Sequence, residues 1–148
     1  MEEFKVLDES YLDLMANLYK DSFMGEPWND NWSDPVQLNE YIKEISCHYN
    51  SLNYGLFIDG KLSALSIGLI RHWWEGTNYN IEELCVSPDL QGKGIGTRFL
   101  EMIEEDIKKR GLKGIFLQTD LDKPSYKFYL KNGFEELDKH VSFYKKAK

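Results

Sequence analysis

The chain has 148 residues, of which 42% are hydrophobic and 29% are charged, and its formal net charge is −7. These values are typical of one ordinary globular domain and disfavour a nucleic-acid-binding protein, which needs a basic patch. No apolar run approaches the roughly 20 residues of a membrane span, and the N-terminus lacks the basic and apolar regions of a secretory signal. We therefore expect a cytoplasmic protein without a membrane partner.

Sulfur and imidazole side chains predict neither a disulfide framework nor a metal site. The two cysteines, Cys47 and Cys85, each lie in an apolar context that favours a buried thiol. The three histidines, His48, His72 and His140, have no metal-ligand spacing. We expect no metal.

The first half of the chain predicts a strand, two helices and a hairpin. Residues 4–7 form a short apolar strand, and a first helix is predicted from Leu12 to Phe23 by apolar residues at helical spacing. After a turn-rich segment, Asp34 and Pro35 mark the start of a second helix. Its predicted buried face consists of Leu38, Tyr41, Ile42, Ile45 and Tyr49. A hairpin follows, with strands 54–58 and 62–70 joined at Asp59-Gly60, and then a strand over 78–86.

The second half predicts a long helix, further strands and a short helix. Apolar residues from Ile95 to Ile107 recur at helical spacing, and Gly111 ends this helix. A strand is expected over 114–119, a short helix over 124–131, and closing strands at Phe134 and over 141–144. The order β-α-α-β-β-β-α-β-α-β-β predicts a single α+β domain, residues 1–148, with one mixed, mostly antiparallel sheet flanked by helices.

A glycine-rich segment over 91–98 joins the strand 78–86 to the long helix. Glycine allows positive φ and close approach of a ligand, and the first amides of a helix lack intrahelical partners, so a phosphate is the expected ligand. Lys93 is followed by glycine and not by Ser or Thr, which excludes a P-loop. The glycine spacing also departs from that of a dinucleotide-binding fingerprint. The pattern Gln-x-x-Gly-x-Gly remains, after a strand that carries Glu-Leu-x-Val.

A second motif makes the assignment specific. Phe128-Tyr129-Leu130-Lys131-Asn132-Gly133-Phe134 follows the strand over 114–119. Together with the glycine loop, in this order and at this distance, it resembles the signatures of the GNAT superfamily of N-acetyltransferases. The resemblance covers residues 81–134, and the N-terminal third only by the order of its elements.

The resemblance implies the acyl-CoA N-acyltransferase (GNAT) fold, in which acetyl-CoA lies where the sheet splays between its fourth and fifth strands. The backbone of Leu84, Cys85 and Val86 would then pair with the pantetheine arm. Asp122 and Ser125 stand where the family often has Asn and Ala near the pantetheine, and Tyr129 would point at the thioester sulfur. The pyrophosphate would be held by the amides of Gln91, Gly92, Lys93, Gly94, Ile95, Gly96 and Thr97.

Acetyl transfer to an amine needs a base, because an alkylammonium has a pKa of about 10.4. Glu82 matches an acidic position on the fourth strand of many family members, and alternation would put Glu83 on the opposite face. We expect Glu82 rather than Glu83 to face the cleft, and Tyr129 to protonate the departing thiolate. In the alternative interpretation, the two glutamates are solvated or pair across strands, and Tyr129 is a core residue. Cys85 is a poor candidate nucleophile, because nothing near it in the sequence activates it.

Aromatic and acidic residues predict the acceptor site. The candidate acceptor-site residues are Glu26, Trp28, Trp32, Trp73 and Trp74. Such residues suit a cation, and the Glu-Pro-Trp-Asn loop resembles one seen among aminoglycoside 6′-N-acetyltransferases. Alternatively, the tryptophans pack in a lid or in a homodimer contact.

The leading interpretation is an acetyl-CoA-dependent N-acetyltransferase for a small cationic amine, such as an aminoglycoside or a polyamine. The amine would attack directly in a ternary complex. Acetylation of a protein or peptide amine, and a non-catalytic acyl-CoA-binding regulatory module, remain as alternatives.

Overall fold

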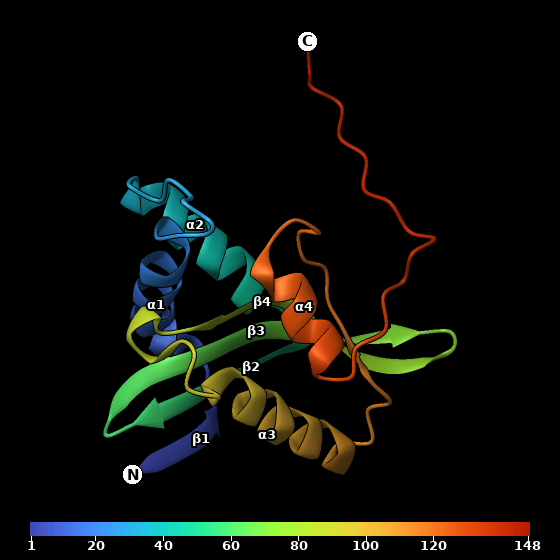
Figure 1. The fold of residues 1–148 in the computed structure, drawn as a ribbon, viewed down its shortest axis with the longest axis horizontal. Helices are drawn as coiled ribbons and strands as arrows, with labels where there is room; N and C mark the ends of the chain where they lie inside the picture. The colour runs from blue at the N-terminus through green and yellow to red at the C-terminus, as the bar shows by residue number, and fades with distance from the viewer. The chain divides into compact units, whose positions relative to one another are not determined.

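The computed structural model describes residues 1–148, which form two compact units, Met1–Gln118 and Thr119–Lys148 (Figure 1). The first unit contains the sheet and three of the α-helices, and the second contains one short helix. No helix is long and apolar enough to cross a membrane.

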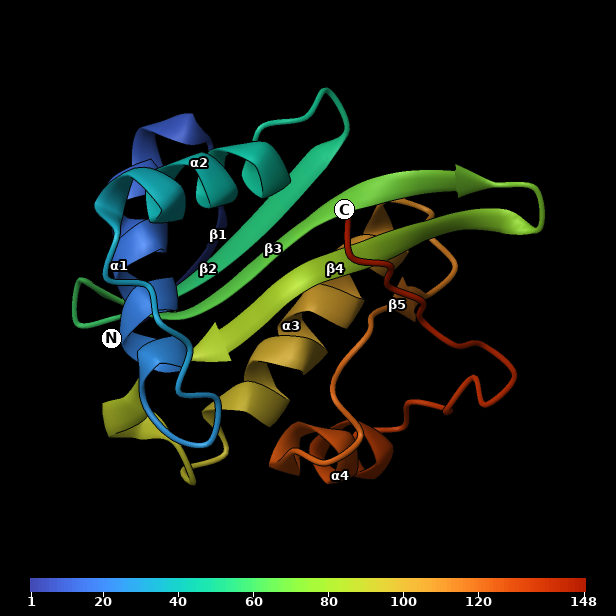
Figure 2. The ribbon, with the colours of Figure 1, turned by 90° about the horizontal axis from the view of Figure 1, so that it is seen from above.

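The sheet of the first unit has five strands in the order β1-β2-β3-β4-β5 (Figure 2). Its strands are β1 (Glu2–Val6), β2 (Ser51–Ile58), β3 (Lys61–Trp73), β4 (Gly76–Val86) and β5 (Ile115–Phe116). Neighbours are antiparallel except β4 and β5, which pair in parallel over only two residue pairs, Tyr79↔Ile115 and Asn80↔Phe116. Beyond Asn80, β4 has no strand on this side. The mixed sheet and its opening between the fourth and fifth strands match the predicted GNAT fold.

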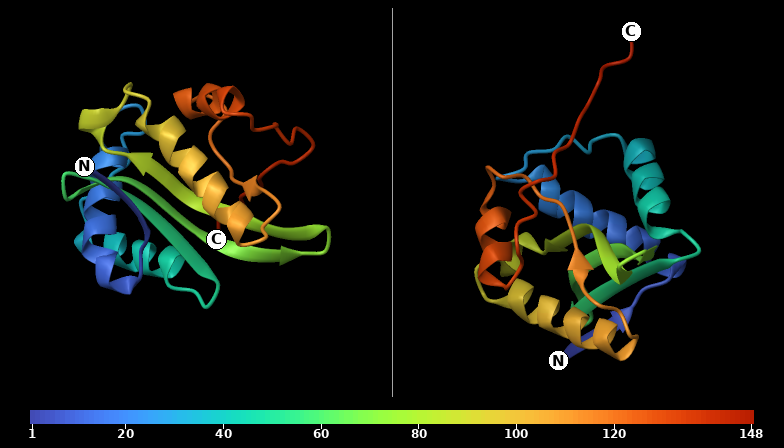
Figure 3. Two further views of the ribbon diagram at one scale, coloured as in Figure 1. Left: turned by 90° about the horizontal axis from the view of Figure 1, so that it is seen from below. Right: turned by 90° about the vertical axis from the view of Figure 1, so that its right-hand side faces the viewer.

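Helices cover both faces of this sheet, with α1 and α2 on one face and α3 on the other (Figure 3). They are α1 (Leu12–Met24), α2 (Pro35–Ser46) and α3 (Ile95–Lys109), and two short 3-10 helices, η1 (Glu9–Tyr11) and η2 (Pro88–Leu90), precede α1 and α3. The two faces have separate apolar cores, one containing Met15, Ile42 and Leu65 and the other Tyr54 and Phe99. Burial of these two helix stripes on one sheet provides most of the hydrophobic stabilisation.

Local sequence explains the main boundaries of these elements. The Asp34 carboxylate accepts hydrogen bonds from the amides of Val36 and Gln37, so it caps α2 as predicted. The hairpin turns at Asp59-Gly60, whose φ angles of 51° and 81° are those of a primed turn.

A β-bulge interrupts the pairing of β3 with β4. Ile67 pairs with Glu83, but the next residue, Gly68, pairs with Ile81, so Glu82 is the extra residue. A side chain at position 68 would collide with β4, because an added Cβ would lie 2.5 Å from the Asn80 carbonyl oxygen and 2.6 Å from the Tyr79 ring. The glycine therefore lets the backbones approach each other at the bulge.

Gly68→Ala is expected to lower the free energy of unfolding by about 1–3 kcal/mol, because β3 and β4 must move apart to accept the methyl group. Chemical denaturation monitored by circular dichroism measures the effect. Gly114→Ala is the matched control, since a Cβ there meets its nearest neighbour at an ordinary 3.6 Å. Equal stability of the two variants would contradict the close approach at the bulge.

Several predicted features of the first unit are wrong. The second helix ends at Ser46, so Tyr49 is not on its buried face and is 98% exposed. Cys47 is exposed at the helix C-terminus, whereas Cys85 is buried as predicted. The strand expected over 114–119 is reduced to Ile115–Phe116, where β4 offers a pairing partner.

In the second unit the predicted short helix forms as α4 (Pro124–Lys131). Gly133, at φ +87°, ends it, and the amide of Phe134 donates to the Tyr129 carbonyl oxygen at 3.0 Å. The closing strands predicted at Phe134 and over 141–144 are absent. The apolar residues Val141 and Phe143 are 70% and 94% exposed. They have the alternation of a strand but no strand to pair with, and an unpaired segment is not stable alone.

Candidate active site

Glu83 is the half-buried carboxylate of β4, and it faces helices α1 and α2. Its Oε2 accepts hydrogen bonds from the Tyr41 hydroxyl at 2.7 Å and from the Tyr19 hydroxyl at 3.4 Å. Burial raises the pKa of Glu83 to about 7, and the nearby charges of Asp30 and Glu82 add to the rise, while the two tyrosines oppose it. A carboxyl group with this pKa is well matched to take a proton near neutral pH.

The bulge places the two glutamates on one side of the sheet, which contradicts the expected placement of Glu82 and Glu83 on opposite faces. Ile81 and Leu84 both belong to the core on the α3 face, although strict alternation would place them on opposite faces. Glu82 follows Ile81 and Glu83 precedes Leu84, so alternation places each glutamate on the face opposite to its neighbour, which is the α1–α2 face. The Glu82 side chain is exposed and makes no hydrogen bond, whereas Glu83 is held by the two tyrosines. The geometry therefore favours Glu83 as the base.

The raised pKa of Glu83 predicts a cost to stability. An unfolded chain releases the Glu83 proton near pH 4.5 and the folded chain near pH 7, so stability falls as pH rises through this window. Glu83→Gln is expected to stabilise the protein at pH 8 by up to about 3 kcal/mol and to change its stability little at pH 4. Solvent screening of the partly exposed carboxylate makes the gain at pH 8 smaller than this upper value. Thermal unfolding at both pH values measures the difference. A variant that is less stable than the wild type at pH 8 would contradict this.

One of the four candidate tryptophans, Trp32, packs on both tyrosines that bond Glu83. The Trp32 ring stacks on Tyr41, with centroids 5.2 Å apart, and meets Tyr19 edge-on at 5.4 Å. Its indole Nε1 is buried without a hydrogen-bond partner. The Trp28 ring packs on Phe23, with centroids 5.3 Å apart. Both tryptophans are partly buried against the apolar core on the α1–α2 face. Through Trp32, the segment between α1 and α2 thus packs against the two tyrosines that bond Glu83.

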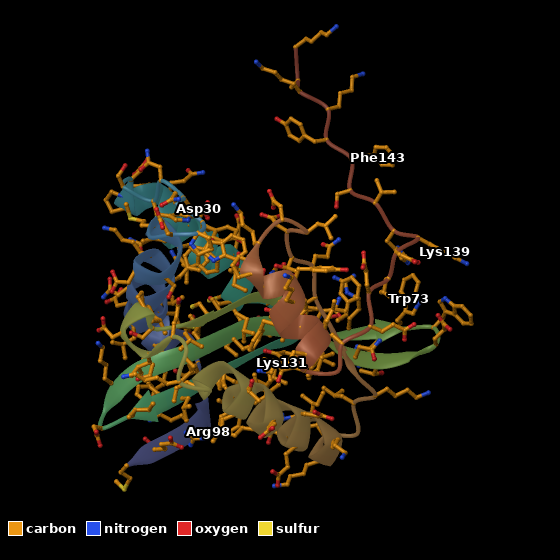
Figure 4. All side chains as sticks on the ribbon, in the orientation of Figure 1. Asp30, Trp73, Arg98, Lys131, Lys139 and Phe143 are labelled. Atoms are coloured by element: carbon orange, nitrogen blue, oxygen red, sulfur yellow. The ribbon has the colours of Figure 1, made fainter.

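The other predicted acceptor residues are less well placed. Trp73 and Trp74, 55% and 82% exposed, lie at the tip of the β3–β4 hairpin. Trp73 is six positions along β3 from Ile67, the partner of Glu83, which corresponds to roughly 20 Å. Figure 4 shows Trp73 and Asp30 at opposite ends of the first unit. Glu26 is exposed in the segment between α1 and α2, and the structure gives it no contact with Glu83.

The glycine loop turns through positive φ angles and leads into a helix N-terminus that no side chain caps. Gly92 and Gly94 have φ of +79° and +78°, and space is open beside each of them. Gly94 is the N-cap of α3, and no side chain caps that helix, so the first amides, from Ile95 to Thr97, have no side-chain acceptor. These residues fit a pyrophosphate group. Lys93 is exposed beside them, and Arg98 pairs with Glu2 of β1.

The end of β4 lies opposite the same loop. The Val86 carbonyl oxygen accepts hydrogen bonds from the Gln91 side chain at 3.3 Å and from the Ser22 hydroxyl at 3.4 Å. Cys85 is buried, and this burial raises the pKa of its thiol to about 12. A thiol so seldom ionised is a weak nucleophile.

The remaining predicted cofactor residues belong to the second unit. The Tyr129 ring lies between Phe128 and Phe134, with centroids 5.3 and 5.2 Å away. Ser125 shares a hydrogen bond of 2.7 Å with the Thr119 hydroxyl, and Asp122 is exposed. No group of three His, Cys, Asp or Glu residues is arranged to hold a metal ion.

Sequence reasoning missed three members of this arrangement, namely Tyr19, Tyr41 and Asp30. The two tyrosines were expected only as buried helix positions. Their hydroxyl groups could have indicated a polar neighbour, because a buried tyrosine hydroxyl needs a hydrogen-bond partner. Burial and the Glu83 charge raise the pKa of both tyrosines, so they remain donors.

Residues 12–134 match the acetyltransferase (GNAT) family. An uncharacterized N-acetyltransferase of Methanocaldococcus jannaschii is 40% identical over 57 residues, which are 38% of this chain and 25% of that protein. The chain spans about half the length or less of the curated relatives that it matches.

Solved structures share the fold over the whole chain. A possible acetyltransferase from Clostridium difficile superposes with a TM-score of 0.82 at 16% identity, covering 100% of this chain and 99% of the other. The aminoglycoside N-acetyltransferase AAC(6′)-Iy, in complex with the bisubstrate analog CoA-S-monomethyl-acetylneamine, gives 0.73 at 20% identity, with 100% and 99% covered. Because the family match extends over most of the chain, the protein belongs to the GNAT family of acetyltransferases.

Proposed function

We propose that this protein transfers the acetyl group of acetyl-CoA to a primary amine of a small cationic acceptor, with Glu83 as the general base. One observation carries the proposal. Glu83 is a half-buried carboxylate with a pKa of about 7, and it lies on the part of β4 that has no β5 neighbour. The strand then leads into a helix whose N-terminal amides are uncapped.

The reaction is a direct displacement. An acceptor ammonium transfers a proton to Glu83, directly or through a water molecule, and its nitrogen attacks the acetyl carbonyl carbon. The C–N bond forms and the C–S bond breaks, the nitrogen then releases a second proton, and the departing CoA thiolate takes up one proton. A buried, high-pKa Cys85 disfavours an acetyl-cysteine intermediate. The glycine-loop amides would hold the pyrophosphate, and the open edge at Leu84, Cys85 and Val86 would meet the pantetheine.

The surroundings of Glu83 support a cationic acceptor. Asp30 and Glu82 add negative charge near the Glu83 carboxylate, and the rings of Tyr41 and Trp32 stack beside it. Carboxylates and aromatic faces both attract ammonium groups. The likeness to an enzyme bound to an acetylneamine analog supports an aminoglycoside-like polyamine as the first class to test.

Steady-state thiol release from acetyl-CoA tests the acceptor class. The panel contains neamine, spermidine, a neutral amino sugar and a lysine peptide, each at several concentrations. We expect the polycations to have a kcat/KM at least roughly tenfold above that of the neutral amino sugar, and salt to reduce the difference. If the lysine peptide had the highest kcat/KM, the small-molecule proposal would be contradicted and a protein substrate would be favoured.

Tyr129 is proposed as the acid that protonates the thiolate, because an ordinary phenol has a pKa near that of the leaving group. Tyr129→Phe is then expected to lower kcat by roughly 10- to 100-fold, with acetyl-CoA affinity retained. Tyr126→Phe, in the same helix, is the control, since its hydroxyl bonds to Glu136 at 2.6 Å. Similar kcat values for the two variants, measured at saturating substrates, would exclude this role.

A further inference from the structure

Two tyrosines from different helices converge on one oxygen of the proposed base. Tyr41 of α2 donates to Oε2 of Glu83 at 2.7 Å, and Tyr19 of α1 is the more distant donor to the same oxygen at 3.4 Å. No side chain of the first unit donates to Oε1. The carboxylate is therefore held asymmetrically, with two donors on Oε2 and no side-chain donor of the first unit on Oε1.

Aromatic packing fixes the two donors. Tyr41 stacks on Trp32 at an interplanar angle of 21°, Trp32 meets Tyr19 edge-on, and the Tyr19 and Tyr41 rings lie 5.7 Å apart. Tyr19 is also 3% exposed and packs on Phe23. A donor whose ring cannot move loses little entropy when it bonds, so the hydroxyl positions are set before a substrate arrives.

We infer that Tyr41, with Tyr19 as the weaker second donor, is a positioning residue that fixes Oε2 of Glu83 and leaves Oε1 to receive the proton from the acceptor ammonium. The inference rests on the proposed function, because it assigns a role within the same site. The proton moves from the acceptor nitrogen to Oε1, and neither tyrosine gains or loses one.

The charges around Glu83 make the consequence measurable. Asp30, from the segment before α2, and Glu82, on β4 itself, both disfavour the ionised form of Glu83, as does its burial. The two tyrosine hydroxyls act in the opposite direction and keep the pKa from rising further. Cys85, the other titratable group on this side of β4, is neutral at these pH values. Loss of a donor should therefore raise the pKa of Glu83.

Tyr41→Phe tests the inference, because phenylalanine keeps the ring stacked on Trp32 and removes only the hydroxyl. The carboxyl carbon of Glu83 is titrated by NMR in protein labelled with ¹³C-glutamate, with Glu83→Gln used for assignment. We expect the midpoint to rise by about one pH unit in Tyr41→Phe, and by less in Tyr19→Phe, whose bond is longer. The acidic limb of kcat/KM should move to higher pH by the same amounts.

Tyr54→Phe is the matched control. It removes a tyrosine–carboxylate hydrogen bond of 2.6 Å, to Asp106, on the opposite face of the sheet. It should leave the Glu83 midpoint unchanged. An unshifted Glu83 midpoint in Tyr41→Phe would overturn the inference even if acetylation proceeds. A shifted midpoint in a protein that acetylates no amine would instead refute the proposed function and leave the positioning contact intact.

Discussion

Glu83→Gln is expected to reduce kcat/KM for the acceptor amine by about 10²–10⁴-fold, the usual contribution of a general base. The amide keeps the volume of the side chain and can still accept from Tyr41, but it takes up no proton. Wild-type activity should fall tenfold per pH unit below the Glu83 pKa of about 7, because only the ionised carboxylate serves as base. The variant should lack this limb. Initial rates from pH 5 to pH 9 measure both effects.

Glu82→Gln is the control for this experiment. Glu82 is next in the chain, carries the same charge and is exposed without a hydrogen bond. Its loss removes one charge that raises the Glu83 pKa, so the acidic limb should persist and move slightly to lower pH. If Glu82→Gln eliminated the limb and Glu83→Gln retained it, the assignment of the base would have to be reversed.

Gly94→Val is expected to abolish measurable binding of acetyl-CoA, with a weakening of at least roughly 100-fold. A branched side chain at φ +78° strains the loop, and it occupies the space beside the helix N-terminus that now is open. The amides from Ile95 to Thr97 could then no longer converge on a pyrophosphate. Isothermal titration calorimetry with acetyl-CoA measures the loss.

Gly111→Val separates binding from stability. Gly111 has φ +79° with nothing near a Cβ, and it lies just beyond the other end of the same helix. Both substitutions should cost about 1–2 kcal/mol of stability from backbone strain, but only Gly94→Val should lose the ligand. Wild-type affinity in Gly94→Val would remove the glycine loop from the proposed site.

Local patterns were sufficient to predict most helices and strands. The apolar periodicity of α1 and α3, the Asp34 cap and the turn at Asp59-Gly60 each depend on residues close in sequence, and the structure contains all of them. The closing strands could not be predicted in the same way, because a strand exists only where another strand pairs with it. Alternation at Val141 and Phe143 carries no information about such a partner.

The candidate site shows the same division. The open conformation of the glycine loop could be predicted because it depends on glycines within a few residues of one another. The expectation that Glu82 and Glu83 lie on opposite faces was wrong, because alternation assumes a regular strand and the bulge opposite Gly68 breaks it. The contacts of Glu83 with Tyr41 and Tyr19 join residues 42 and 64 positions apart, so only tertiary packing reveals them.

The most direct test of direct acetyl transfer is a single turnover with stoichiometric acetyl-CoA and an excess of neamine, followed by mass spectrometry of both the amine and the intact protein. The account predicts one acetyl group on an amine nitrogen of the acceptor, free CoA, and a protein of unchanged mass. An acetylated protein, above all one modified at Cys85, would contradict direct attack. Bound but untransferred acetyl-CoA in the presence of every cationic amine tested would contradict the proposed function itself.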